Sequence, residues 1–244
     1  MIIIGITGPI GHGKSTLAQN LVALNPSAQQ FESSEVISEI ASQLNTFFMD
    51  EEPASDDLAS VNQWLCHLPD ILAAVLGNTY PAELFVITKE QITTVPRDFE
   101  KLFEYINLAQ KDPALVQTQI TQVNKADYRA ILQWIGGFCV NRIRRTIWND
   151  ELIRRATKSG CSMAILGGVR FAEEAENIKK HGGIIVEIER SHAEEQDIDD
   201  PTERERSQIS ADVTIRNDHD LADLKNKSIK LYEDIRANKL QTIY

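Results

Sequence analysis

The sequence predicts an α/β fold, in which helices cover both faces of a parallel sheet and a helical segment is inserted into the chain. Short apolar runs, typical of strands buried on both faces, occur at residues 1–7 and again after residue 160. Stretches with apolar residues at helical spacing follow these runs, and strands that alternate with helices favour a parallel sheet. Between these two parts, residues 45–158 are mainly helical in pattern.

The segment after the first predicted strand carries a phosphate-binding motif. Residues Gly8–Ser15 match G-x-x-x-x-G-K-[ST] at every fixed position, and leucines at helical spacing predict a helix over 14–24. Glycines let backbone N–H groups surround phosphate oxygens, and the helix N-terminus adds a positive potential. The motif predicts a nucleoside triphosphate site on a three-layer P-loop NTPase-type parallel sheet with a helical insertion. An ordinary glycine-rich turn is the alternative, which the flanking strand and helix disfavour.

Within this loop, we expect Lys14 to reach the outer phosphates as a point charge. The hydroxyl of Ser15 is expected to complete the coordination of Mg²⁺. The residues expected to hold ATP are Gly8, Pro9, Ile10, Gly11, His12, Gly13, Lys14, Ser15 and Thr16.

The remaining elements follow in chain order. Residues 28–31 predict a second strand, and a loop that is acidic and contains proline is expected at 50–57. Helices are predicted at 36–48, 58–67, 69–76, 98–109, 113–123 and 127–158, the last as two helices that meet at Gly136-Gly137. Strands are then predicted at 163–166, 184–188 and 213–215, with helices at 172–181 and 221–238. We expect one P-loop domain with a core of residues 1–44 and 159–244 and a helical insertion of residues 45–158.

Charge and composition exclude several classes of protein. The net charge of −11 and pI near 5.0 argue against coating DNA or RNA, because that affinity comes from Lys and Arg. Three widely spaced cysteines without a C-x-x-C pair are typical of reduced thiols, and no stretch has membrane-spanning length. The histidines lack metal-ligand spacing. We expect a cytoplasmic protein without nucleic-acid or membrane partners, and the choice between monomer and homodimer stays open.

The inserted segment carries an arginine and an amide that suit a nucleotide. Arg129 and Gln133 are four residues apart and share one helical face, with the glycine pair one turn later. Arginine can bind a phosphate through two hydrogen bonds, and glutamine can pair with a base edge. Arg142 adds positive charge downstream. The alternative is a solvated basic helix face.

Two further arginine-bearing segments follow predicted strands. Arg170 lies at the carboxyl end of the strand at 163–166, the edge at which open parallel sheets bind ligands. It either contacts a ligand phosphate or pairs with Glu173 or Glu174. The polar segment of residues 191–207 is either a surface loop or a lid that closes over phosphates and excludes water. In the lid interpretation, Arg204 and Arg206 face the phosphates.

The residues before the last predicted helix have a structural interpretation. Asn217-Asp218 are expected to form a turn and to cap this helix, in preference to contacting a base.

Taken in order, these motifs resemble the bacteriophage-type deoxynucleoside monophosphate kinases of the P-loop kinase group. The matching residues are Gly8–Ser15, Tyr128-Arg129-x-x-Leu132-Gln133-x-x-Gly136, Trp148, Val169-Arg170-Phe171-x-x-Glu174-Ala-Glu176, Gly182-Gly183 before a strand ending in Arg190, and Ala211-Asp212-x-x-Ile215-x-Asn217-Asp218. The match spans most of the chain except residues 45–125. The resemblance implies Mg²⁺- and ATP-dependent phosphorylation of a (deoxy)nucleoside monophosphate to the diphosphate.

The resemblance implies that Arg129 and Gln133 hold the acceptor, and that Arg170 and a lid arginine stabilise the transferred group. The motifs described above add further residues to each set. The substrate-binding residues are expected to be Glu35, Arg129, Gln133 and Arg142. The catalytic residues are expected to be Lys14, Arg170, Arg204 and Arg206.

The sequence departs from the family pattern at two places. The family reads Asp-x-Arg-Phe where this chain has Gly168. The chain therefore lacks the carboxylate that the family has near the metal, and Glu32 and Glu35 are candidates to supply one. The lid lacks the family's His-x-Ser-Glu. Two other functions therefore stay open: a dephospho-coenzyme A kinase or related small-molecule kinase, and a nucleotide-binding regulatory protein without efficient transfer. Assays against a panel of acceptors separate the three.

Overall fold

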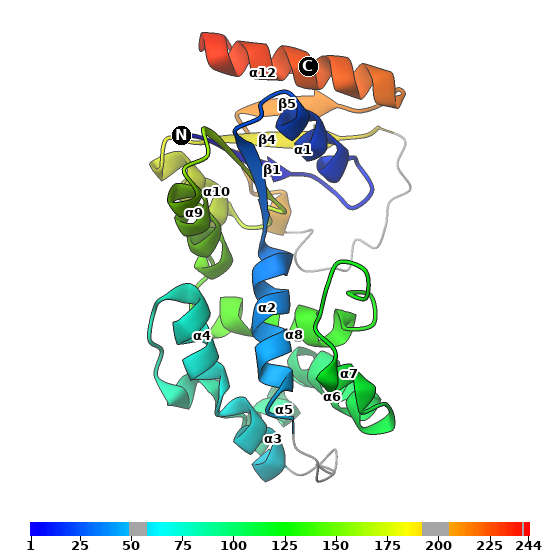
Figure 1. Cartoon of the computed structure of the whole chain (residues 1–244), viewed down its shortest axis with the longest axis vertical. Coiled ribbons are helices and arrows are strands. Elements are labelled where there is room, and N and C mark those ends of the chain that lie inside the picture. The colour runs from blue at the N-terminus through cyan, green and yellow to red at the C-terminus, as the bar shows by residue number, and fades with distance from the viewer. Residues whose placement is uncertain (49–57, 192–204, 241) are drawn as a thin grey trace. The chain divides into compact units, whose positions relative to one another are not determined.

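The computed structural model describes residues 1–48, 58–191, 205–240 and 242–244 (Figure 1). Contacts between residues divide the chain into two compact units. We call residues 1–33 and 145–244 the sheet unit, and residues 34–144 the helical unit. The predicted acidic loop at 50–57 lies outside the described residues.

The sheet unit contains five parallel strands in the order β2-β3-β1-β4-β5, as the sequence predicts for an α/β fold. The strands are β1 Ile2–Thr7, β2 Ala28–Glu32, β3 Met163–Gly167, β4 Ile184–Glu189 and β5 Val213–Arg216. The apolar run of β1 is continuous because this central strand is buried on both faces. Its Ile4 pairs with Ile165 on one side and Ile184 on the other.

Helices cover both faces of this sheet. They are α1 Lys14–Ala23, α9 Ile147–Ser159, α10 Ala172–Lys180 and α12 Leu221–Ala237. On one face, α1 packs against α12, and Leu17, Leu21 and Leu224 join the buried isoleucines of β1. On the other face, α9 packs on β2 and β3, and α10 packs on β1 and β4. The sheet and its two helix layers form a three-layer unit (Figure 1). Because all five strands are parallel, their carboxyl ends lie at one edge of the sheet.

The helical unit is built around α6 and α8, which pack against each other through buried apolar side chains. Its elements are α2 Ser33–Asn45, α3 Leu58–Leu65, α4 Leu68–Leu76, η1 Ala82–Phe85, α5 Lys89–Thr94, α6 Arg97–Lys111, α7 Ala114–Gln117 and α8 Arg129–Arg142. Neither η1 nor α5 is among the elements predicted from the sequence. The start of α5 was readable, because Thr88 and Gln91 form a capping box. The helix predicted at 113–123 is much shorter, since the backbone at Thr118 is extended.

The predicted division of residues 127–158 at Gly136-Gly137 is wrong. The helix α8 runs through both glycines and ends at Arg142. Each glycine costs a helix about 1 kcal/mol relative to alanine. Burial of a large apolar side chain contributes about 1.5–3 kcal/mol, and Ile135 and Phe138 flank the glycines in the core. A side chain on Gly136 would also crowd Ile37, 3.3 Å away.

The boundaries between the two units lie at 33/34 and 144/145, whereas the sequence analysis placed them at 44/45 and 158/159. The difference concerns α2 and α9. The pattern of apolar residues shows that each is a helix with one buried face, but not which layer buries that face. Contacts with β2, β3 and α10 assign α9 to the sheet unit. Within the described residues, no helix is long and apolar enough to cross a membrane.

Candidate active site

The loop Gly8–Ser15 connects β1 to α1 and has glycine at three positions where the backbone requires it. Gly8, Gly11 and Gly13 have φ angles of 141°, 81° and 105°, in the region that side chains disfavour. A Cβ on Gly8 would overlap with the carbonyl oxygen of Ile188, and one on Gly13 would lie 2.6 Å from Nδ2 of Asn217. All three glycines therefore serve the turn, and Gly8 and Gly13 also allow its close packing against Ile188 and Asn217.

The ammonium group of Lys14 lies within this loop. Its Nζ donates to the carbonyl oxygens of Gly8 and Pro9, at 2.6 and 2.7 Å. The next residue, Ser15, exposes its hydroxyl in the first turn of α1. Helix N–H groups, an ammonium and a hydroxyl oxygen form a donor set that fits a magnesium-bound polyphosphate.

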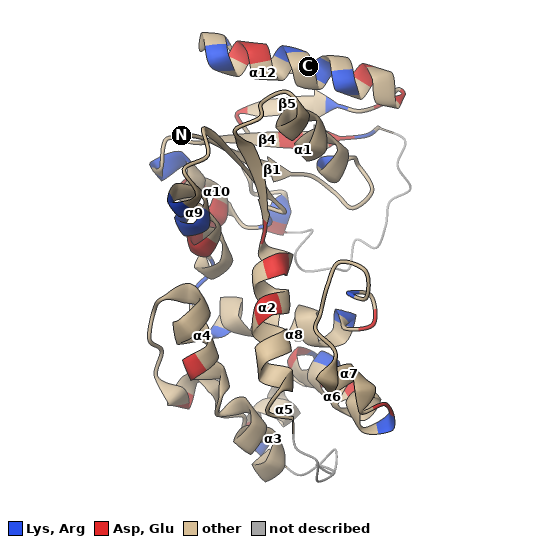
Figure 2. Ribbon diagram, viewed as in Figure 1, with Lys and Arg blue, Asp and Glu red and all other residues tan. Residues whose placement is uncertain are grey.

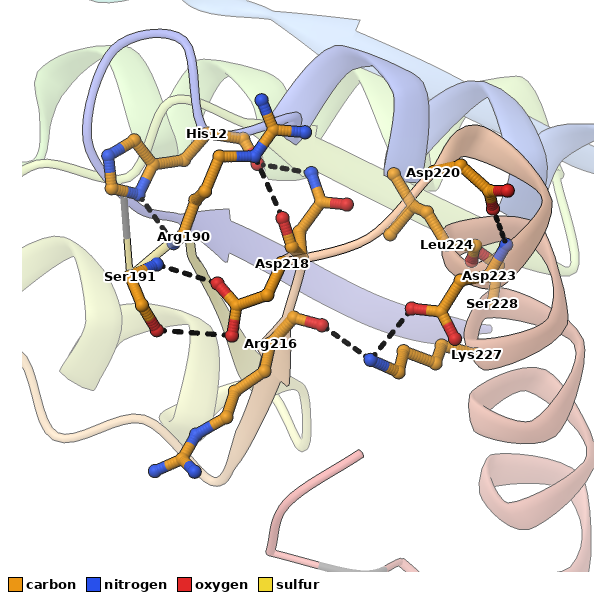
Figure 3. Close-up of polar contacts among 11 residues, drawn as sticks. His12, Arg190, Ser191, Arg216, Asp218, Asp220, Asp223, Leu224, Lys227 and Ser228 are labelled. Atoms are coloured by element: carbon orange, nitrogen blue, oxygen red, sulfur yellow. Dashed lines mark hydrogen bonds and ion pairs between the residues drawn. The ribbon is translucent and has the colours of Figure 1, made fainter. Parts of the chain in front are cut away.

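Contacts from the ends of β4 and β5 hold the loop at His12 (Figure 3). The amide of Asn217 donates to the carbonyl oxygen of His12 at 2.9 Å, and the backbone N–H of Arg190 donates to its Nδ1 at 3.0 Å. Nε of Arg190 in turn donates to the carbonyl oxygen of Asn217 at 2.8 Å. Asn217 is buried. The sequence analysis missed this support, because no local pattern links residues 205 positions apart.

The prediction that Asn217-Asp218 cap the last helix is wrong. The N-cap of α12 is Asp220, whose side chain accepts from the N–H of Asp223 at 2.9 Å. Asp218 instead accepts hydrogen bonds from the backbone N–H and hydroxyl of Ser191, at 2.6 and 3.1 Å (Figure 3). Asp218 and Asp220 both lie just before the helix, so the preference of aspartate for N-cap positions does not show which of them caps it.

The segment after β3 is tied to the end of β1. The hydroxyl of Thr7 donates to the carbonyl oxygen of Val169 at 2.9 Å, and the N–H of Val169 donates to the carbonyl oxygen of Ile6 at 3.1 Å. Thr7 immediately precedes the phosphate loop. These contacts therefore anchor the turn that carries Arg170 beside the start of that loop.

The carboxylate of Glu174 binds the backbone of this turn. Its Oε2 accepts from the N–H groups of Arg170 and Phe171, at 2.8 and 3.2 Å. The guanidinium of Arg170 is exposed and forms no hydrogen bond or ion pair with the residues that the structure describes. Glu174 therefore fixes the backbone of Arg170, and the arginine side chain extends from the carboxyl edge of the sheet.

Burial makes the contribution of Glu174 to the stability of the protein depend on pH. Desolvation raises the pKa of this carboxyl from 4.5 to about 7, against the lowering effect of the two N–H groups and of Arg170. The folded protein thus binds this proton more tightly than the unfolded chain does. The stability that the protonated form provides is present at low pH and is lost as the pH rises through about 7.

We expect Glu174→Gln to gain stability relative to the wild type as the pH is raised from 5 to 8. The gain follows because glutamine accepts the backbone hydrogen bonds without a buried charge. The pKa shift of Glu174 corresponds to a change of up to roughly 3 kcal/mol in the free energy of unfolding. Urea unfolding at both pH values measures it. Glu176→Gln, an exposed position on the same helix, is the control. A difference in unfolding free energy that does not change with pH would contradict the expectation.

Of the two lid arginines, Arg204 lies outside the described residues. Arg206 pairs with Glu187 of β4 at 3.3 Å, and burial raises the pKa of Glu187 while Arg206 lowers it. The neighbouring Glu205 pairs with Arg145 at 2.7 Å. Arg206 is therefore bound to the sheet in this structure.

In the helical unit, α8 presents Arg129 and Gln133 on one exposed stripe, at the predicted spacing. Neither side chain forms a hydrogen bond or ion pair with another described residue. Arg142 is different, because its guanidinium stacks on the ring of Phe138, with 5.1 Å from its carbon to the ring centroid. Arg129 and Gln133 thus differ from Arg142, because their polar groups make no contact of this kind with the described residues.

Glu35 lines a cavity of about 370 Å³ in the same unit. The cavity lies between α2 and residues 119–122, which are joined by a hydrogen bond of 3.0 Å from the N–H of Ile120 to the hydroxyl of Ser42. Glu35 and Glu39 are the acidic residues of α2 (Figure 2), and the other polar lining groups are hydroxyls and amides. This lining has no basic residue, so that it suits a neutral group with N–H donors, such as a nucleobase, better than a phosphate.

Comparison with known proteins found a family match over much of the chain. A family model described as deoxynucleotide monophosphate kinase matches residues 74–228, which is more than half of the sequence. The matched region contains Arg129, Gln133 and Arg170, and it does not contain the phosphate loop. No curated protein matched the chain.

Proposed function

Because the chain belongs to the deoxynucleotide monophosphate kinase family, we propose that it transfers the γ-phosphoryl group of ATP to the phosphate of a (deoxy)nucleoside monophosphate. An acceptor phosphate oxygen forms a bond to the γ-phosphorus, the bond to the β–γ bridging oxygen breaks, and ADP leaves with a nucleoside diphosphate as the product. The phosphate loop around Lys14 carries this proposal. It lies outside the matched residues, so that it supports kinase chemistry independently of the family match.

On the donor side, the backbone N–H groups of residues 10–16 and the ammonium of Lys14 hold the phosphates of ATP, with Gly8 and Pro9 completing the loop. The hydroxyl of Ser15 holds Mg²⁺, which neutralises phosphate charge when it is bound. Arg170 and the lid arginines Arg204 and Arg206 stabilise the charge on the transferred group. The exposed guanidinium of Arg170 supports its assignment, while Arg206 must first leave Glu187.

On the acceptor side, Arg129 binds the phosphate of the monophosphate and Gln133 contacts its base. The support is that both groups are exposed and unengaged on one face of α8. Glu35 contributes from the cavity along α2. Arg142 adds positive charge at the end of α8, with its orientation set by Phe138.

A phosphotransfer assay with ATP and each common ribo- and deoxyribonucleoside monophosphate tests this function. We expect ADP and a nucleoside diphosphate to form in equal amounts with at least one acceptor. Dephospho-coenzyme A is included as an acceptor, and its phosphorylation in place of the monophosphates would assign the small-molecule kinase instead. Binding of ATP without transfer to any acceptor would favour the regulatory protein.

A further inference from the structure

The carboxyl end of β2 lies directly beside Gly167, the last residue of β3. The strand register pairs Glu32 with Gly167. A Cβ placed on Gly167 would overlap with the carboxylate of Glu32, with 2.6 Å to its Oε2. The carboxylate of Glu32 therefore occupies the space that a side chain at the end of β3 would otherwise fill.

A second residue of β2 orients this carboxylate. Nε2 of Gln30 donates to Oε1 of Glu32 at 2.6 Å, and the two residues lie on the same face of the strand. Glu32 is half-buried. The carboxylate is thus held at the sheet edge by a neighbouring amide, in the space that Gly167 leaves.

The position of Glu32 relates it to the phosphate loop. Gly167 is followed by Gly168 and Val169, and Val169 is bonded to Ile6 and Thr7 at the end of β1. The loop begins one residue later. Glu32 therefore lies in the same unit as the loop, at the edge where open parallel sheets bind their ligands. Glu35, the other candidate, belongs to the helical unit and lines its cavity.

We propose that Glu32 supplies the carboxylate that holds the nucleotide's Mg²⁺, through its bound water, in place of an acidic residue just after β3. The proposal rests on the proposed function. A carboxylate and the hydroxyl of Ser15 are the hard oxygen donors that Mg²⁺ prefers, and this ion usually keeps several waters.

The variant Glu32→Gln tests the proposal through binding of a non-hydrolysable ATP analogue with Mg²⁺ and with EDTA. We expect the affinity in EDTA to equal that of the wild type, and the half-saturating Mg²⁺ concentration to rise by about 10–100-fold. Glu32→Asp should recover part of the loss. The control is Glu233→Gln, an exposed position on α12 that should leave both values unchanged. Unchanged Mg²⁺ dependence in Glu32→Gln would overturn the proposal.

A second variant, Gly167→Ala, displaces the carboxylate without removing it. Gly167 has ordinary strand geometry, and the overlapping group is the end of a flexible side chain, so we expect the protein to fold. The Mg²⁺ requirement should rise in the same direction as in Glu32→Gln. Thermal unfolding checks the fold, and a folded Gly167→Ala protein with wild-type Mg²⁺ dependence would also contradict the proposal.

We expect Gly168→Asp not to raise turnover above that of the wild type. Gly168 has a φ of 74°, so that a side chain there strains the backbone, although no atom lies within 4 Å of the added Cβ. Gly168→Asn carries the same strain without the charge and separates the two effects. Higher turnover in Gly168→Asp, but not in Gly168→Asn, would show that the site lacks a carboxylate and would overturn the role of Glu32.

The wild-type measurement separates failure of this inference from failure of the proposed function. If the wild type binds no ATP analogue, the proposed function fails, and the role of Glu32 fails with it. If the wild type binds the analogue in a Mg²⁺-dependent way and Glu32→Gln behaves identically, only the role of Glu32 is wrong.

Discussion

Lys14→Ala is expected to lower turnover by roughly 10³-fold or more while leaving the protein folded. The loss follows because a fixed positive charge is removed where negative charge accumulates during phosphoryl transfer. The two hydrogen bonds to Gly8 and Pro9 are lost as well, at a cost of about 1 kcal/mol each to stability. Steady-state turnover at saturating ATP and acceptor, together with thermal unfolding, measures both effects.

Two further variants make this result specific. Lys14→Arg keeps the charge but changes its geometry, and we expect it to remain strongly impaired. Lys225→Ala, at an exposed position on α12, should keep wild-type turnover. Wild-type turnover in a folded Lys14→Ala protein would exclude the phosphate loop from catalysis.

The second large effect is expected at the acceptor. Arg129→Ala should raise the KM for the monophosphate by about 30–150-fold, which corresponds to roughly 2–3 kcal/mol of lost charge-assisted hydrogen bonding. The KM for ATP should stay unchanged, because the donor binds to the phosphate loop. Gln133→Ala should mainly change the ranking of bases, since an amide distinguishes donor and acceptor patterns. Initial rates with several monophosphates measure both variants.

The matched control for Arg129 is Arg97→Ala, which removes an exposed arginine from α6 of the same unit. It should leave the KM values for both substrates unchanged. If Arg129→Ala and Gln133→Ala change only the binding of ATP, then α8 contacts the donor and its assignment to the acceptor is wrong.

Local sequence determined the elements whose signals lie within a few residues. The apolar run of β1, the glycines of the loop and the leucines of α1 are contiguous, and together they suffice to predict the phosphate site. The spacing of Arg129 and Gln133 likewise placed both on one face of α8. The capping box at Thr88 was an equally local signal that predicted a helix and was overlooked.

Only the tertiary structure decided which distant residues meet. The central strand β1 has β3 and β4 as neighbours, and both follow it by more than 150 residues. No local pattern encodes this order, so that the support of His12 by Asn217 was not predictable. The pairing of Arg206 with Glu187 was not predictable either, because an arginine in a loop can reach more than one charged residue on the nearby strands.

The carboxylate of Glu32 at the sheet edge shows most clearly what the sequence determined and what the tertiary structure decided. The resemblance to the family indicated that Gly168 stands where the family pattern has an acid, and the sequence left Glu32 and Glu35 as alternatives. The choice depended on the register of β2 against β3, which sets Glu32 opposite Gly167, and on the division of the chain, which places Glu35 in the other unit. Register is set by the pattern of burial and by the turn that joins two strands. No short turn joins β2 to β3, so no local signal fixes their register.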